Sequence, residues 1–336
     1  MTTDWNTFIA AQGLAADGSH FGNLPEELDV AQHAGVIAPL VDFGLIRASG
    51  PEAPGFLHNL LTNDVNGITG QNARFAGFCT AKGRLLATLL IWREGDDLLL
   101  MLPRDQHAVI LKKLSMYVLR SKVKLTDATT ERVLIGISSA VPPAPTLADL
   151  PAFGATDSHS GRLIRLDAKR WILALPPDAA EGAWTELAQE LKPVGTDTWR
   201  WLEINAAQPR VVAATQEAFI PQMLNMELPA VAGVSFTKGC YPGQEIVAHT
   251  QYLGKVKRRM YRARLGESPS AGTHLYAPAT GDQHCGAVVT TAPSPAGGFD
   301  LLVCVQAGAV EAGEVHVGTT AGPTLQFIDL PYPLGD

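Results

Sequence analysis

The sequence predicts an α+β protein whose C-terminal part is a small all-β barrel or sandwich. Between residues 40 and 138, apolar residues alternate with polar ones in several short runs and recur at helical spacing in others. After residue 255, short apolar runs are separated by clusters of Gly, Pro and Ser, which is typical of an all-β domain. With 336 residues, 46% of them hydrophobic and 18% charged, the chain can bury a sizeable core.

The first block of the chain mixes strands and helices. Residues 40–48 are expected to form a strand, and Gly50-Pro51 then opens a helix, because proline is well tolerated in a first helical turn. A second helix is expected over about residues 105–119. The other strands expected in this block are 73–80, 83–93, 97–102, 122–126 and 132–138.

The second block follows a stretch rich in proline and alanine, residues 140–160, which we expect to be a linker or a long loop. A hairpin over residues 162–175 and a helix that Asp178 could cap then make a smaller α+β unit. The strands expected in the C-terminal part are 260–265, 286–290, 301–305, 314–317 and 325–328.

Several classes of function are disfavoured by what the sequence lacks. Its four cysteines form no C-x-x-C pair and no Cys/His cluster with zinc spacing, so we expect reduced thiols and no metal site. The start resembles no signal peptide and no apolar stretch is long enough to span a membrane, so a cytosolic protein is expected. The P-loop, dinucleotide-binding, zincin and α/β-hydrolase motifs are missing.

The net charge of −7 is unevenly distributed. No Lys or Arg follows residue 266, although seven acidic residues do. Two runs without acids, residues 106–126 and 246–266, carry five and six basic residues. Each run could attract an anion, or could equally be the solvated face of a helix or strand.

One segment stands out as a candidate site. Residues 236–245 place Cys240 between two glycines and two residues after Lys238. Tyr-Pro-Gly at 241–243 has proline and glycine where a type II turn requires them, so Cys240 is expected at a loop tip. If a helix begins at Gln244, its free N–H groups and Lys238 would favour the thiolate form of Cys240. The alternative is an inert thiol on a tight turn.

Residues 238–245 read KGCYPGQE, and on this motif the chain resembles the YgfZ family, whose signature is K-G-C-Y-x-G-Q-E. Residues 43–65, 82–87, 117–127 and 219–227 also resemble that family. One departure is His249, where we would expect arginine. The signature residues carried over are Lys238, Gly239, Cys240, Tyr241, Gly243, Gln244 and Glu245, with Cys240 as the candidate reactive residue.

The YgfZ family in turn resembles the folate-dependent aminomethyltransferases, the T-proteins of glycine cleavage. That resemblance implies ferredoxin-like α+β domains around a central hole that holds tetrahydrofolate or a one-carbon derivative. It implies a pterin contact for Glu203 and, for the folate's glutamate tail, basic contacts that we assign to Lys238, Arg120 and Lys122. The domains expected on this basis are residues 1–139 with 200–254, residues 140–199, and residues 255–336.

The resemblance fails at the catalytic carboxylate of the T-proteins. Aligning on Gly83 puts Ala87 and Thr88 at that position, and neither can act as an acid or base. We therefore expect no orthodox aminomethyl transfer. The resemblance implies instead a folate-binding accessory protein that supports iron–sulfur enzymes or their assembly and, through them, tRNA modification.

Two alternatives remain open at this point. One is a true folate-dependent aminomethyl or methyl transferase that uses a different acid. The other is an RNA-binding module that uses the basic run from Lys255 to Arg264. We expect direct tRNA binding to be the weaker of these, because an acidic segment follows that run.

Overall fold

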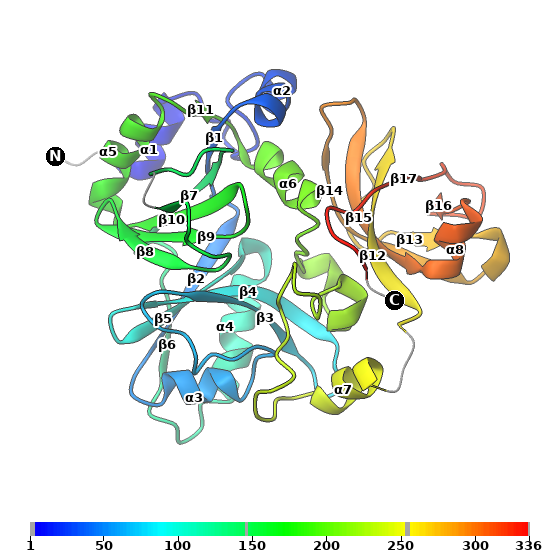
Figure 1. The fold of residues 1–336 in the computed structure, drawn as a ribbon, viewed down its shortest axis with the longest axis horizontal. Helices are drawn as coiled ribbons and strands as arrows, with labels where there is room; N and C mark the ends of the chain where they lie inside the picture. Colours follow the sequence, from blue (N-terminus) through cyan, green and yellow to red (C-terminus); the bar gives the residue numbers. More distant parts are fainter. Residues whose placement is uncertain (1–3, 145–146, 253–255, 335–336) are drawn as a thin grey trace. The chain divides into compact units, whose positions relative to one another are not determined.

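Three β-sheets form the framework of the protein. The computed structural model describes residues 4–144, 147–252 and 256–334. The chain forms two units, each of which mixes helices and strands (Figure 1). Unit 1 comprises Met1–Phe56, Val65–Arg74 and Leu90–Trp199, and unit 2 comprises Leu57–Asp64, Phe75–Leu89 and Arg200–Asp336. The predicted α+β class is confirmed.

The first six-stranded sheet lies in unit 1 and has the order β11-β1-β7-β10-β9-β8. The pair β1 and β11 is parallel, and the other pairs of this sheet are antiparallel. Its strands are β1 (Val36–Pro39), β7 (Val133–Ser138), β8 (Ala155–Ser158), β9 (Gly161–Arg165), β10 (Arg170–Leu175) and β11 (Lys192–Pro193).

Helices cover this sheet with aromatic side chains. The helices α1 (Trp5–Ala11) and α5 (Pro177–Leu187) lie together (Figure 1), and the rings of Trp5 and Trp184 meet edge to face with centroids 5.8 Å apart. The ring of Trp199 packs against Gly136 of β7, where an added Cβ would lie 2.6 Å from it. The helix α2 (Leu24–His33) also lies in unit 1, whereas α6 (Thr196–Asn205) begins in unit 1 and continues into unit 2.

The five-stranded sheet has the order β3-β4-β5-β2-β6, and the boundary between the units runs within β3 and β4. His107 of α4 packs on β2, with its Nε2 2.9 Å from the carbonyl oxygen of Leu45. This close approach requires glycine at position 44, where a Cβ would come within 2.8 Å of the imidazole. The elements are β2 (Phe43–Ser49), α3 (Ala53–His58), β3 (Ala73–Cys79), β4 (Leu85–Glu94), β5 (Asp97–Pro103), η1 (Arg104–Gln106), α4 (His107–Met116) and β6 (Lys124–Asp127).

The C-terminal sheet lies in unit 2, is antiparallel throughout and has the order β16-β13-β14-β15-β12-β17. It curls around a buried core that includes Leu275, Val288 and Val303, as the β-barrel expected from the sequence would. Its strands are β12 (Arg258–Leu265), β13 (His274–Tyr276), β14 (His284–Pro293), β15 (Phe299–Gln306), β16 (His316–Val317) and β17 (Gln326–Ile328). Unit 2 also contains η3 (Ala213–Thr215), η4 (Pro221–Leu224), α7 (Gln244–Tyr252), η5 (Pro278–Thr280) and α8 (Ala307–Ala312).

Three local expectations were wrong. The strand expected over residues 40–48 begins later, as β2 at Phe43, and just before it the carbonyl of Asp42 accepts a hydrogen bond from the backbone N–H of Arg104. Asp178 does not cap α5, because the helix begins at Pro177, and the carboxylate lies in the first turn. Residues 140–160 are not all loop, since β8 pairs with β9 at their end.

We predict that Gly136→Ala destabilises the protein by about 1–3 kcal/mol, because the new methyl group would press into the Trp199 ring. Gly182→Ala is the matched control, since Gly182 is exposed within α5 and an added Cβ there meets nothing within 4 Å. The control is expected to stabilise by up to ~1 kcal/mol, through helix propensity alone. Urea denaturation measures the free energy of unfolding of both variants. Equal denaturation midpoints for the two variants would show that Trp199 does not pack on β7.

Candidate functional site

The candidate site is built around the turn at residues 241–243, which precedes α7. Gly243 has a φ of +83°, as a type II turn requires, and α7 begins at Gln244 as predicted. A Cβ on Gly243 would lie 2.5 Å from the backbone nitrogen of Gly83 and from the carbonyl oxygen of Thr80. The turn between β3 and β4 and the turn before α7 therefore touch backbone to backbone, and glycine is required at this contact.

Gly239 has a different role from the one expected. Its φ is not among the positive values, so the chain does not need glycine there to turn. An added Cβ would instead lie 3.8 Å from Nε2 of His58, in ordinary contact. The residue before Cys240 thus lies beside the imidazole of His58.

Lys238 fastens the loop that carries Cys240. Its Nζ donates hydrogen bonds to the carbonyl oxygens of His58 and Leu61, the latter at 2.8 Å, and lies 4.6 Å from the ring centroid of Tyr241. Because α3 ends at His58, the ammonium meets the negative end of that helix. Burial lowers the pKa of Lys238 to about 8, against the opposing charges of Asp64 and Cys240.

Cys240 is the one exposed cysteine of the four. Burial raises the pKa of Cys79 and of Cys304 to about 12, and also raises that of Cys285, so these three thiols stay protonated at neutral pH. Cys240, next to the ammonium of Lys238, is the thiol that a second molecule can reach.

Two neighbours of the loop were not singled out in the sequence. His58 and Asp64 form a pair with Nδ1 and Oδ1 3.1 Å apart, and the imidazole is largely buried. The segment between them is tied to residues 232 and 233, because the Thr62 hydroxyl donates to the Gly233 carbonyl and the Asn63 amide to that of Ala232. Both residues lie in the family-like stretch 43–65, but only the fold places them beside residue 239.

Glu203 of α6 is buried and already has a partner. Its Oε2 lies 2.6 Å from Nη2 of Arg210, and both side chains are about nine-tenths buried. A guanidinium at this distance orients the carboxylate. Arg210 is a third residue that the sequence analysis missed; its place in Pro209-Arg210, seven residues after Glu203, carries no recognisable motif.

The position of the missing catalytic acid is fully enclosed. Ala87 and Thr88 are buried in β4, and the Thr88 hydroxyl oxygen accepts a hydrogen bond of 3.1 Å from the backbone N–H of Val211. Both side chains therefore pack in the core, and the hydroxyl of Thr88 also provides a hydrogen-bond acceptor for a backbone N–H group. Neither side chain supplies a charged group.

The four residues proposed to contact folate are divided between the units. Arg120 and Lys122 are exposed in unit 1, beyond the end of α4, and the backbone N–H of Lys122 donates to the Glu52 carboxylate. Glu203 and Lys238 belong to unit 2. Among the described residues, Glu203 pairs with Arg210, whereas Lys238 donates to the backbone carbonyls of residues 58 and 61. The departure at His249 lies on α7, with its side chain exposed.

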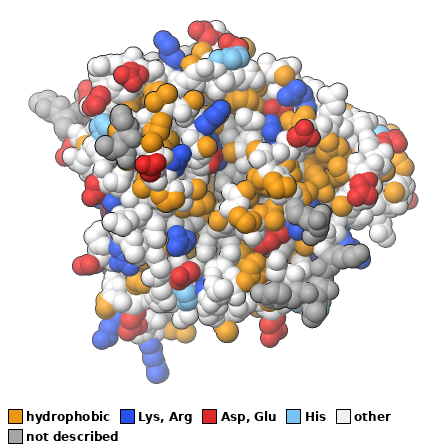
Figure 2. Space-filling model, in the orientation of Figure 1, with side chains coloured by type: hydrophobic (Ala, Val, Ile, Leu, Met, Phe, Trp, Pro, Cys, Tyr) orange, Lys and Arg blue, Asp and Glu red, His pale blue; other side chains and the backbone are white. Residues whose placement is uncertain are grey.

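The basic run at 255–264 is largely used within unit 2. Arg259 is ion-paired with Glu227 and Arg264 with Asp300, the latter at 2.8 Å, and Arg262 donates to the Asn205 side chain at 2.7 Å. Lys255 lies outside the described residues. On the face shown in Figure 2, basic and acidic side chains are interspersed and form no continuous basic surface.

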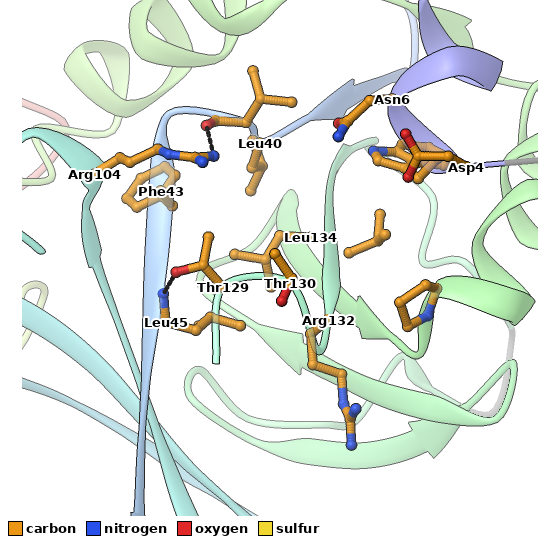
Figure 3. A pocket seen from close by; sticks show the side chains of 14 residues that line it. Asp4, Asn6, Leu40, Phe43, Leu45, Arg104, Thr129, Thr130, Arg132 and Leu134 are labelled. Carbon is orange, nitrogen blue, oxygen red and sulfur yellow. Dashed lines mark hydrogen bonds between the residues drawn. The ribbon is translucent and has the colours of Figure 1, made fainter. Parts of the chain in front are cut away.

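A small cavity in unit 1 has no link to these candidates. It has a volume of about 150 Å³ and lies between Asp4 and Arg104 (Figure 3). Arg104 donates to the Val41 carbonyl there, and the Leu45 N–H donates to the Thr129 hydroxyl.

No helix in the described parts of the chain is both long enough and apolar enough to cross a membrane. No group of three or more His, Cys, Asp or Glu side chains in the same parts is placed to hold a metal ion.

Comparison with known proteins places the chain in a family. No protein-family model matches it. It is 30% identical over 259 residues to the tRNA-modifying protein YgfZ of Pectobacterium carotovorum subsp. carotovorum (strain PC1), a match that covers 73% of this chain and 75% of that protein. At 16% identity its fold is that of glycine cleavage system aminomethyltransferase T from Bartonella henselae, with a TM-score of 0.70 over 92% of this chain and 89% of the other. From the sequence match we conclude that the chain belongs to the family of the tRNA-modifying protein YgfZ.

Proposed function

We propose that this protein is a cytosolic folate-binding accessory protein that supports the assembly or repair of iron–sulfur enzymes, including enzymes that modify tRNA, with Cys240 as its reactive thiol. The observation that carries the proposal is the exposure of Cys240 on a fastened loop while the other three thiols are buried. The name of the relative, a tRNA-modifying protein, supports the tRNA part.

The chemistry of a single exposed thiol limits what Cys240 can do. An iron–sulfur cluster usually needs about four thiolates, and the other three cysteines here are buried. Cys240 would therefore ligate an iron of a cluster transiently, or take the outer sulfur of a partner's persulfide as the partner's thiolate leaves. It could also form a mixed disulfide by attacking a disulfide of a partner protein, which releases one thiolate of that disulfide. The three contacts of Lys238 would hold the loop in one geometry for this purpose.

Glu203 would hold the pterin ring of tetrahydrofolate or of a one-carbon derivative. A carboxylate has about four lone-pair sites, so Oε1 stays available for pterin N–H groups while Oε2 is paired with Arg210. Arg210 would orient the carboxylate. Lys238, Arg120 and Lys122 remain proposals for the glutamate tail, although two donor positions of Lys238 already serve backbone carbonyls.

An aminomethyl or methyl transferase is the second candidate, because the fold is that of aminomethyltransferase T. It would need an acid other than the one that Ala87 and Thr88 replace. Turnover of tetrahydrofolate to its methylene form with an amine donor would favour this candidate. The RNA-binding alternative is weakened by the internal partners of Arg259, Arg262 and Arg264.

We predict that Glu203→Gln weakens binding of tetrahydrofolate by about tenfold to hundredfold, since it removes a charge-assisted hydrogen-bond acceptor. Anaerobic calorimetry measures the affinity. Glu227→Gln is the matched control, because Glu227 is also a buried carboxylate paired with an arginine of unit 2. Equal affinities for Glu203→Gln and the unchanged protein would remove Glu203 from the folate site.

Cys240→Ala is expected to bind tetrahydrofolate normally and to fail to restore iron–sulfur enzyme activity in cells that lack the protein. The reason is that the substitution removes the accessible thiol and leaves the buried core intact. Cys285→Ala, which removes a buried thiol, serves as the control and should restore activity. If Cys240→Ala restores activity as well, the thiol has no part in the function.

The buried ammonium of Lys238 predicts a pH dependence of stability. Its folded pKa of about 8 lies below the ordinary 10.5, so the unfolded chain binds more protons between these values. The free energy of unfolding should therefore rise with pH in this window, relative to Lys238→Met, which cannot titrate. Urea denaturation between pH 7.5 and 10 tests this, with Lys82→Met at an exposed lysine as control. If the free energies of unfolding of the unchanged protein and of Lys238→Met differ by the same amount at every pH, the expectation is wrong.

A further inference from the structure

A pocket in unit 2 lies apart from Glu203 and from the loop of Cys240. Its volume is about 220 Å³, and its lining comes from β12 to β15 and from the segment that carries η3 and η4. Arg258, His274 and His284 supply its charged and polar side chains, and Phe219 and Met223 supply apolar ones. Of the residues that line it, Arg258 belongs to the basic run considered in the sequence analysis, and the others were not predicted to be functional.

Two imidazoles are stacked in this pocket. The rings of His274 in β13 and His284 in β14 are nearly parallel, 15° apart, with centroids separated by 4.4 Å. Both side chains are exposed. Within the described parts of the chain, no ring nitrogen of His274 or His284 has a hydrogen-bond or ion-pair partner. The N–H groups of both rings are therefore available to a ligand.

Arg258 is fixed beside these rings. Its Nη2 donates to the carbonyl oxygen of His284 at 3.1 Å, which uses one of five N–H donors. Arg84 donates to the carbonyl of Ala218, which also lines the pocket, at 2.8 Å. Two guanidinium groups thus stand in or next to a pocket whose lining contains no carboxylate.

The electrostatics of the imidazoles agree with this geometry. Burial, His274 and Arg258 together lower the pKa of His284, because the surroundings repel a further positive charge. Burial raises the pKa of the thiol of Cys304, which also lines the pocket, to about 12, so this thiol is neutral. No other titratable group lines the pocket, so an anion is what would relieve the repulsion.

A larger pocket in unit 1, of about 580 Å³, is also rich in arginine, but its arginines are paired with carboxylates. There Arg47 is paired with Glu131 at 2.7 Å and Arg162 with Asp157 at 2.6 Å, and Arg132 is paired with Glu94. Each guanidinium is neutralised by a carboxylate, so that pocket offers no net attraction to an anion. The pocket of Arg258 lacks such partners among the described residues.

We propose that the pocket of Arg258, His274 and His284 binds a small phosphate monoester. The guanidinium fork and the imidazole N–H groups would hold the phosphate oxygens, and Phe219 and Met223 would contact the organic part of the ligand. This site is independent of the proposed folate and thiol functions, since it shares no residue with them.

The affinity is tested with phenyl phosphate, using calorimetry and the imidazole signals of a ¹H–¹⁵N spectrum. Arg258→Gln and His284→Gln should each weaken binding about tenfold or more, because each loses a charged hydrogen bond. His33→Gln is the control: His33 is exposed on α2 in unit 1 and pairs with Asp29. Arg258→Lys keeps the charge and should retain part of the affinity, which separates lost binding from lost folding.

The part played by the imidazoles is tested with inorganic sulfate, whose charge does not change between pH 8 and pH 5.5. Sulfate should bind several-fold more tightly at pH 5.5, since an anion favours the protonated rings, and His284→Gln should reduce that gain. A sulfate affinity that does not change with pH, or phenyl phosphate binding that survives both Gln substitutions, would overturn the proposal.

Discussion

The contact between the turns at Gly83 and Gly243 fixes the geometry of the candidate site. It brings the backbone of the β3–β4 connection against the turn before α7, at a distance that leaves no space for a side chain. The start of α7, the position of Tyr241 and hence the base of the loop with Cys240 all follow from this contact. Lys238 then fastens the other side of the same loop to the end of α3. An exposed thiol is thus carried by a loop that is held at two points.

Much of this local geometry could be predicted from the sequence. The need for glycine at 243, the start of a helix at Gln244 and the exposure of Cys240 follow from turn chemistry within ten residues. The partners His58, Asp64 and Arg210 could not be predicted, because they come from distant or unpatterned segments that only the fold brings together. The late start of β2, at Phe43, was missed for the same reason, since the hydrogen bond to the carbonyl of Asp42 comes from residue 104.

In the C-terminal half, a run of basic residues in the sequence does not by itself identify a binding surface. Four arginines lie in β12, and three of them neutralise or satisfy internal groups: Arg259 meets Glu227, Arg262 meets Asn205 and Arg264 meets Asp300. Only Arg258, at the start of the strand, has a neighbouring pocket without a carboxylate. Arg259 leaves the opposite face of the strand from Arg258, whereas Arg262 and Arg264 share the face of Arg258 and meet their partners further along it.

The distribution of the thiols has a practical consequence. A thiol reagent that does not cross membranes would react with one accessible cysteine per folded chain. When a part of the structure unfolds, the cysteines buried in that part would become reactive as well. Cys79 is buried in β3, whereas Cys285 and Cys304 belong to neighbouring strands of the C-terminal sheet. The unlabelled natural protein therefore carries its own reporters, which distinguish opening of the C-terminal sheet from opening of the region around β3.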